Sequence, residues 1–176
     1  MAANYCHQCG GGLHLGKVAG DGILRLSCER CDFILYENPK NICCGLVVDG
    51  EKLMLCKRAI EPRIGRWTLP GGYMECGETS KQAVAREVKE ETGADVSVRK
   101  LVSIVNASSH NQVFFYYSCE LQSDFLDSTP ECLEVRLFNR DELEGLDYAF
   151  SPIKKVVHYF LSQQDSSNFD IFELDV

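Results

Sequence analysis

The spacing of apolar and polar residues changes along the chain, and each change marks an expected element. Two apolar runs between residues 41 and 59 flank Asp49-Gly50, a dipeptide typical of hairpin turns. Runs rich in β-branched and aromatic residues predict further strands. These strands cover residues 95–106, 112–122 and 133–138, and the tail at 165–176 is expected to add an edge strand.

Two other segments follow the helical period. After Ser151-Pro152 the apolar residues recur at helical spacing, which predicts a helix capped by Ser151 with the proline at its first position. Thr79 and Gln82 form a capping box, and Gly93 is a typical C-terminal stop, so a second helix is expected over about residues 80–92. Several strands with isolated helices indicate an α/β fold with a mixed sheet sandwiched by helices.

The first 38 residues differ in character from the rest. Two cysteine pairs, Cys6/Cys9 and Cys28/Cys31, are separated by 18 residues, and this spacing is typical of a tetrahedral structural Zn²⁺ site. The residues between them predict a strand, a turn and a strand. Because so short a block buries little surface, the metal should supply much of its folding energy. We therefore predict a zinc ribbon over residues 1–38 and a second domain over 39–176.

Net charge and the length of the apolar runs limit the kinds of molecule that the protein is expected to bind. The chain has 176 residues and a formal net charge of −8, and residues 1–40 contain four basic and four acidic side chains. Nucleic-acid binding requires a basic face, so no nucleic-acid partner is expected. No apolar run reaches the ~18–20 residues that span a bilayer, and no signal peptide is evident. We expect a cytoplasmic protein without a membrane partner, and a plastid location only if a transit peptide is missing from this chain.

The remaining cysteines fall mostly within apolar runs. A disulfide framework is typical of small secreted chains, and nothing in the sequence indicates secretion. We expect these cysteines to be small buried apolar residues. Cys76 is the exception, because it lies in a polar, glycine-rich loop.

Three glutamates of the helix expected at 80–92 lie on one arc of about 100° beside its apolar stripe, namely Glu87, Glu90 and Glu91. Arg86 falls on the opposite, solvated side. Carboxylates crowded beside a buried stripe repel one another and cost free energy unless a cation is present. Hard oxygen ligands at this spacing suit Mg²⁺ or Mn²⁺. The alternative is a charged, solvent-exposed helix face that needs no metal.

The residues around this helix match a longer pattern. Gly72, Glu78, Arg86-Glu87-Val88, Glu90-Glu91 and Gly93-Ala94 follow the spacing G-x5-E-x7-R-E-U-x-E-E-x-G-U, where U is apolar. This stretch resembles the Nudix box, and the preceding GRWTLPGG is similar to the strand that leads into the box. The resemblance implies a Nudix-type mixed sheet preceded by a zinc ribbon, and a Nudix family diphosphatase.

The resemblance also implies roles for individual residues. The box would hold divalent metals against a diphosphate, and water would attack one phosphorus. Arg86 would orient the carboxylates, and the general base would be Glu87 or Glu134, two alternatives that stay open. Glu91 is expected to be essential for hydrolysis. The implied metal ligands are Glu87, Glu90, Glu91, the carbonyl of Gly71 and, through water, Glu78.

The box does not identify the substrate. The S-Q-P-W-P-F-P run of NADH diphosphatases is absent, and many ADP-ribose hydrolases carry a proline where this chain has His110. The segments YENPK and YAFSPI are similar to zinc-ribbon Nudix enzymes of plants and bacteria described as FAD or ADP-ribose diphosphatases. The resemblance therefore implies hydrolysis of FAD, to AMP and FMN, or of ADP-ribose. NADH diphosphatase activity and a non-catalytic Nudix-fold nucleotide sensor are the alternatives.

Aromatic side chains can stack on adenine or flavin, and cationic side chains can contact phosphate. Each candidate also has an ordinary structural role as a core or strand-edge residue. A homodimer is compatible with the resemblance, although the sequence identifies no interface. The candidate substrate-binding residues are Arg58, Tyr73, Phe114 and Tyr116.

Overall fold

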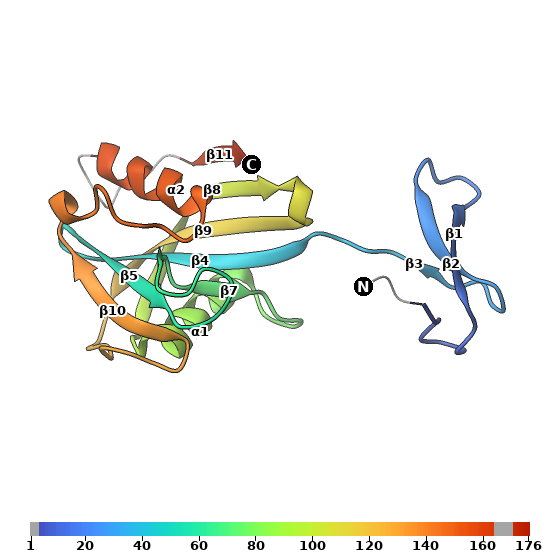
Figure 1. Cartoon of the computed structure of the whole chain (residues 1–176), viewed down its shortest axis with the longest axis horizontal. Helices are drawn as coiled ribbons and strands as arrows, with labels where there is room; N and C mark the ends of the chain where they lie inside the picture. The colour runs from blue at the N-terminus through green and yellow to red at the C-terminus, as the bar shows by residue number, and fades with distance from the viewer. Residues whose placement is uncertain (1–3, 164–170) are drawn as a thin grey trace. The chain divides into compact units, whose positions relative to one another are not determined.

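The computed structural model describes residues 4–163 and 171–176 and divides into two compact units at Asn38/Pro39. Figure 1 shows a small three-stranded unit and a larger unit built on one sheet. Within the described residues, no helix has the length and apolar character needed to cross a membrane.

The small unit is an antiparallel sheet of β1 (Leu13–Lys17), β2 (Leu24–Cys28) and β3 (Ile34–Leu35), in that order. Its register pairs Leu13, at the start of β1, with Cys28, at the end of β2. The second cysteine pair therefore lies at the same end of the hairpin as the first cysteine pair. Leu15 is 63% exposed, and the buried apolar side chains among its described residues are Cys6 and Cys28. The unit thus has almost no apolar core of its own.

The large unit contains a sheet of eight strands. Six strands form the path β10-β5-β4-β9-β8-β11, while β6 pairs with β5 and β7 pairs with β4. The pairs β4/β9 and β8/β11 are parallel and the others antiparallel, so the sheet is mixed, as predicted. The strands are β4 (Lys40–Asp49), β5 (Lys52–Arg58), β6 (Trp67–Thr68), β7 (Gly71–Tyr73), β8 (Val96–Ala107), β9 (Gln112–Leu121), β10 (Cys132–Phe138) and β11 (Phe172–Asp175).

Two α-helices cover opposite faces of this sheet (Figure 1). Alternate residues of β4 point to opposite sides: Leu46 packs in the cluster that contains α2 (Ser151–Ser162), and Val47 in the cluster that contains α1 (Ser80–Thr92). Short 3₁₀ turns follow β8 (Ser108–His110) and β10 (Arg140–Glu142). The α/β sandwich expected from the sequence is confirmed.

Most element predictions hold. The hairpin turns at Gly50, which has a φ of 59°, and the helix predicted over 80–92 spans those residues. The tail adds β11 as a parallel edge strand, although residues 165–170 of the predicted segment lie outside the described residues. Five of the six cysteines outside the paired motifs are buried, and Cys76 is exposed.

The predicted start of the second helix is wrong by one residue. Phe150 occupies the cap position with an extended backbone, and no side chain caps the helix. Ser151 and Pro152 are therefore the first two helical residues. The first turn of a helix tolerates proline because its N–H groups have no intrahelical partner.

Candidate functional site

Helix α1 has well-defined ends, and they set the positions of its carboxylates. The Thr79 hydroxyl accepts a bond from the backbone N–H of Gln82, and the Gln82 side-chain oxygen accepts one from the backbone N–H of Thr79. Gly93 closes the helix in the left-handed conformation, with a φ of 74°. Val84 and Val88 are fully buried against the sheet. This anchoring fixes which side of the helix faces β7.

Two glycines allow the backbone of β7 to approach the glutamates of α1 closely. The N–H of Gly71 donates a hydrogen bond of 2.9 Å to the Glu91 carboxylate. A Cβ atom on Gly72 would lie only 2.5 Å from a carboxylate oxygen of Glu87. Gly72, the first glycine of the box, thus leaves the space that the Glu87 carboxylate occupies.

Arg86 binds three of the box carboxylates. Its guanidinium lies 2.7 Å from an oxygen of Glu78, 2.7 Å from Glu87 and 3.0 Å from Glu90. It also donates a bond of 3.0 Å to the carbonyl of Tyr73. The expectation that Arg86 points to solvent is wrong, because the loop before α1 folds back and supplies partners that a helical wheel does not include.

The carboxylates differ in how well they are neutralised. Hydrogen bonds from Arg86 lower the pKa of Glu78. Burial raises the pKa of Glu87 despite its own contact with Arg86. Burial also raises the pKa of Glu91 to about 8, with the neighbouring Cys132 adding to the effect of desolvation. Burial therefore makes the ionised forms of Glu87 and Glu91 costly, and a hard cation with oxygen ligands fits this donor set.

A further glutamate lies near this cluster, on the loop before β10. The charge of Glu131 raises the pKa of both Glu87 and Glu91. Glu134, the candidate base named from the sequence, instead forms an ion pair of 3.6 Å with Lys57. Sequence reasoning missed Glu131, although it stands three residues before Glu134 in the same PECLEV segment.

The predicted substrate-binding residues have different environments. Tyr73 is 47% exposed, and its hydroxyl accepts a bond of 3.2 Å from Gln112. Arg58 donates to the carbonyl of Pro62 and lies over the ring of Phe150. Phe114 is half-buried and stacks on Tyr116, with ring centroids 6.3 Å apart.

Tyr116 requires a correction. Its side chain is fully buried and packs in the cluster that contains α2, so its ring presents no face to a ligand. The alternation of β9 places it on the α2 side of the sheet, whereas Tyr117 packs in the cluster that contains α1. Tyr116 is a core residue, the alternative that its apolar surroundings in the sequence already offered.

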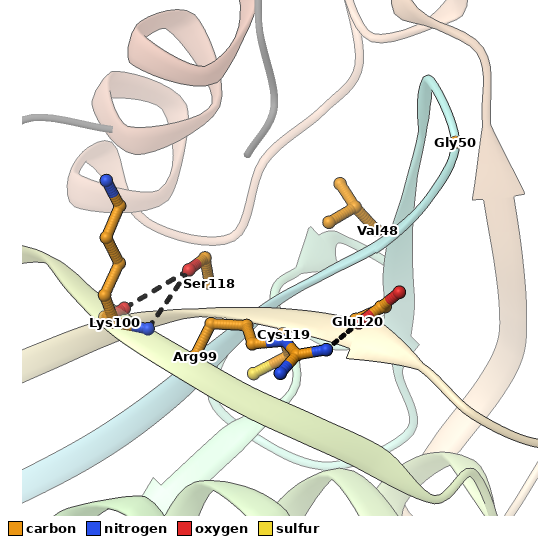
Figure 2. Close-up of a pocket in the computed structure, with 7 residues that line it drawn as sticks. All are labelled: Val48, Gly50, Arg99, Lys100, Ser118, Cys119 and Glu120. Atoms are coloured by element: carbon orange, nitrogen blue, oxygen red, sulfur yellow. Dashed lines mark hydrogen bonds and ion pairs between the residues drawn. The ribbon is translucent and has the colours of Figure 1, made fainter. Parts of the chain in front are cut away.

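A pocket lies where the end of β4, the start of β8 and the end of β9 meet, and it shares no residue with the box (Figure 2). Arg99 in its wall is paired with Glu120, and the Ser118 hydroxyl bonds to the backbone of Lys100. This pocket offers no carboxylate cluster and is separate from the candidate site. The remaining lining residues are Val48, Gly50 and Cys119.

The paired cysteines of the small unit form a compact cluster. The four sulfur atoms of Cys6, Cys9, Cys28 and Cys31 lie within 4.8 Å of one another. Tetrahedral Zn²⁺ with bonds of about 2.3 Å separates sulfurs by about 3.8 Å, and the observed Cys6–Cys31 distance is 3.8 Å. Backbone N–H groups point at two sulfurs, and the one from Arg30 lowers the pKa of Cys28 to about 7. The cluster therefore fits a thiolate-bound metal.

Both units match models of known protein families. A family model described as NUDIX domain matches residues 39–160, and a zinc-ribbon model described as Nudix N-terminal matches residues 4–37. A crystal structure of a NUDIX hydrolase from Nitrosomonas europaea is 35% identical, has a TM-score of 0.93 and aligns over 99% of both chains.

Two curated relatives carry functional names. An ADP-ribose pyrophosphatase of Methanocaldococcus jannaschii is 41% identical over 69% of this chain and 74% of its own length. A NAD-capped RNA hydrolase NudC of Vibrio vulnificus is 34% identical over 79% of this chain, which spans about half (52%) of that relative. Together with the match over residues 39–160, these findings show that the chain belongs to the Nudix hydrolase family.

Proposed function

We propose that the protein is a metal-dependent diphosphatase that cleaves a nucleoside diphosphate linked to a second group, with ADP-ribose as the first candidate. The observation that carries this proposal is the arrangement of α1, where Arg86 holds three carboxylates and Glu91 contacts the backbone of Gly71. The alternative of a plain solvated helix face is disfavoured, because Glu87 and Glu91 are only partly exposed and burial raises the pKa of both.

The box residues divide into ligands and a positioning residue. Glu87, Glu90 and Glu91 would hold Mg²⁺ or Mn²⁺, with the Gly71 carbonyl as a further ligand and Glu78 nearby. When bound, such an ion would neutralise the diphosphate and make a nearby water more acidic. Arg86 keeps the carboxylates close together in spite of their mutual repulsion. Zn²⁺ is the proposed occupant of the cysteine cluster, where it would stabilise the small unit.

The general base would be a carboxylate close to the metal ligands. Glu87 and Glu134 are the candidates from the sequence, and we add Glu131 because its charge acts on both Glu87 and Glu91. Glu134 is instead held in an ion pair of 3.6 Å with Lys57. Comparing Glu131→Gln with Glu134→Gln separates the two candidates on the PECLEV segment, and a larger loss of activity is expected for Glu131→Gln.

The choice of substrate rests on the relatives and on the exposed aromatic residue. The M. jannaschii relative is named for ADP-ribose, and its match covers most of both chains. FAD contains the same adenosine diphosphate unit and remains a substrate candidate from the sequence resemblance. The NudC relative supports a nicotinamide dinucleotide as a second candidate. Tyr73, exposed beside Gly72 and lying near Lys40, is the proposed ring for stacking on a base.

The test is a hydrolysis panel with the full chain. ADP-ribose, FAD, NADH and a nucleoside triphosphate are each incubated with Mg²⁺ or Mn²⁺, and the nucleotide products are resolved by chromatography. We expect ADP-ribose to give AMP and ribose 5-phosphate faster than the triphosphate is cleaved. A well-folded protein that binds ADP-ribose but cleaves nothing in this panel would instead be a nucleotide sensor.

A further inference from the structure

A second group of metal-ligand side chains lies directly beneath the box helix. Across the part of the chain that the structure describes, two groups of three or more Cys, His, Asp or Glu residues bring their ligand atoms within 4.8 Å of one another. One is the cysteine cluster of the small unit. The other consists of Cys56, Glu91 and Cys132, here called the Cys–Glu–Cys group.

Three separate elements hold this group in place. Cys56 lies in β5, Cys132 begins β10, and Glu91 lies in the last turn of α1. Thr129 ties the loop before β10 to the helix, because its hydroxyl donates a bond of 3.0 Å to the Glu91 carbonyl. The same hydroxyl accepts a bond of 3.2 Å from the N–H of Cys132. The three ligand atoms are thus brought together by the fold rather than by neighbouring positions in the sequence.

The chemistry of this donor set differs from that of the box. Mg²⁺ takes oxygen ligands, whereas two thiolates with one carboxylate select a softer ion such as Zn²⁺. Tetrahedral Zn²⁺ requires ligand atoms about 3.5–3.8 Å apart, so atoms within 4.8 Å of one another need only a small inward movement. Both cysteines are buried and Glu91 is partly exposed, so an ion would enter past the carboxylate.

We propose that Cys56, Cys132 and Glu91 form a binding site for Zn²⁺ or a similar thiophilic ion, separate from the ribbon site and sharing Glu91 with the proposed Mg²⁺ site. Formation of the two metal–sulfur bonds releases the two thiol protons to solvent. An ion there takes the Glu91 carboxylate, which the proposed function assigns to catalysis. Zinc bound at this group therefore inhibits hydrolysis, and this consequence rests on the proposed function.

The test counts ions in the full chain under a thiol-free reductant. Protein is saturated with Zn²⁺, excess ion is removed by gel filtration, and native mass spectrometry gives the number retained. We expect two zinc ions per chain in the wild type and one in Cys56→Ser and in Cys132→Ser. Cys119→Ser is the matched control, because Cys119 is equally buried on β9 outside the group, and it should retain two.

Two further readouts keep the result interpretable. Co²⁺ is added to the full chain that carries one Zn²⁺, in the ribbon. It should produce a thiolate charge-transfer band in the wild type and in Cys119→Ser, but not in Cys132→Ser. Circular dichroism checks that each variant is folded, and Glu91→Gln, which keeps both thiols, should bind the second ion more weakly. One retained ion in the wild type would overturn the proposal, as would two in folded Cys132→Ser. A Cys56–Cys132 disulfide with no second ion would overturn it as well.

Activity separates this proposal from the proposed function. The hydrolysis rate of each variant is measured without and with added Zn²⁺, and the quotient of the two rates gives its fold-inhibition by zinc. This fold-inhibition should be at least about ten times larger in Cys119→Ser than in Cys132→Ser. If no variant hydrolyses any substrate while the ion counts are as expected, the zinc site stands and the proposed function fails.

Discussion

Replacing Glu91 with glutamine should abolish activity and at the same time stabilise the metal-free protein. The amide has nearly the same shape and still accepts the bond from the N–H of Gly71. It carries no charge, so it removes both the proposed ligand for the cation and the cost of burying a carboxylate. A residue with a purely structural role would show loss of stability instead.

The magnitude follows from the pKa of Glu91. Burial raises this pKa from 4.5 to about 8. At about 1.4 kcal/mol for each pH unit, the ionised carboxylate costs the metal-free fold at most about 5 kcal/mol. Solvent reaches part of the side chain and screens its charge, so we expect a gain of about 2 kcal/mol from the substitution. For a chain of this size that is a rise in Tm of about 4–8 °C.

The gain has a defined pH dependence. Below pH 4.5 the carboxyl is protonated in both the folded and the unfolded state, so glutamate and glutamine should differ little. Because the folded pKa is the higher one, the wild type loses stability relative to the variant as the pH rises from 4.5 through about 8. Above that range the full difference is present.

The assay is thermal unfolding of the full chain in a buffer that keeps Zn²⁺ in the ribbon but contains no other divalent ion. Wild type and Glu91→Gln are compared at pH 5, 7 and 9, and hydrolysis is measured with Mg²⁺ at pH 8. Adding Mg²⁺ should raise the Tm of the wild type and not that of the variant. A less stable variant at pH 9, or a well-folded variant with wild-type activity, would refute the reasoning.

Three other substitutions test separate parts of the structure. Gly72→Ala should reduce hydrolysis at least about tenfold, because its Cβ would lie 2.5 Å from Glu87, whereas Gly22→Ala, with open space around it, should not. Thr79→Ala should lower the free energy of unfolding by about 1 kcal/mol in urea titrations through loss of the α1 cap, and Thr79→Ser should restore most of it. Tyr116→Phe should leave the free energy of unfolding unchanged or raise it by up to about 1 kcal/mol, because the buried hydroxyl has no hydrogen-bond partner. A loss of substrate affinity with unchanged stability would show instead that Tyr116 contacts the substrate.

Local signals in the sequence predicted the elements well. The capping box at Thr79, the stop at Gly93 and the hairpin at Gly50 each depend on residues close together in the chain, and the structure has all three. Buried stripes such as Val84 and Val88 also follow from periodicity. The exact cap of α2 was missed because Ser151-Pro152 is compatible with either of two adjacent starts.

Features that depend on tertiary contacts could not be predicted. Arg86 turns toward Glu78 because a loop folds back over the helix, which a helical wheel cannot represent. The side of the sheet that Tyr116 faces depends on the register of β9 with its neighbours, and aromatic character alone does not reveal it. The proximity of Cys56 to Cys132 arises from the pairing of β5 with β10, two strands far apart in sequence.

The central claim is that the box carboxylates bind a divalent cation. The most direct measurement is Mn²⁺ binding to the full chain that carries one Zn²⁺, in the ribbon, with the free Mn²⁺ quantified by electron paramagnetic resonance. We predict saturable Mn²⁺ binding in the wild type, at least about tenfold weaker binding in Glu90→Gln and in Glu91→Gln, and unchanged binding in Glu144→Gln, a surface control. Equal Mn²⁺ affinity in all four proteins would contradict the account.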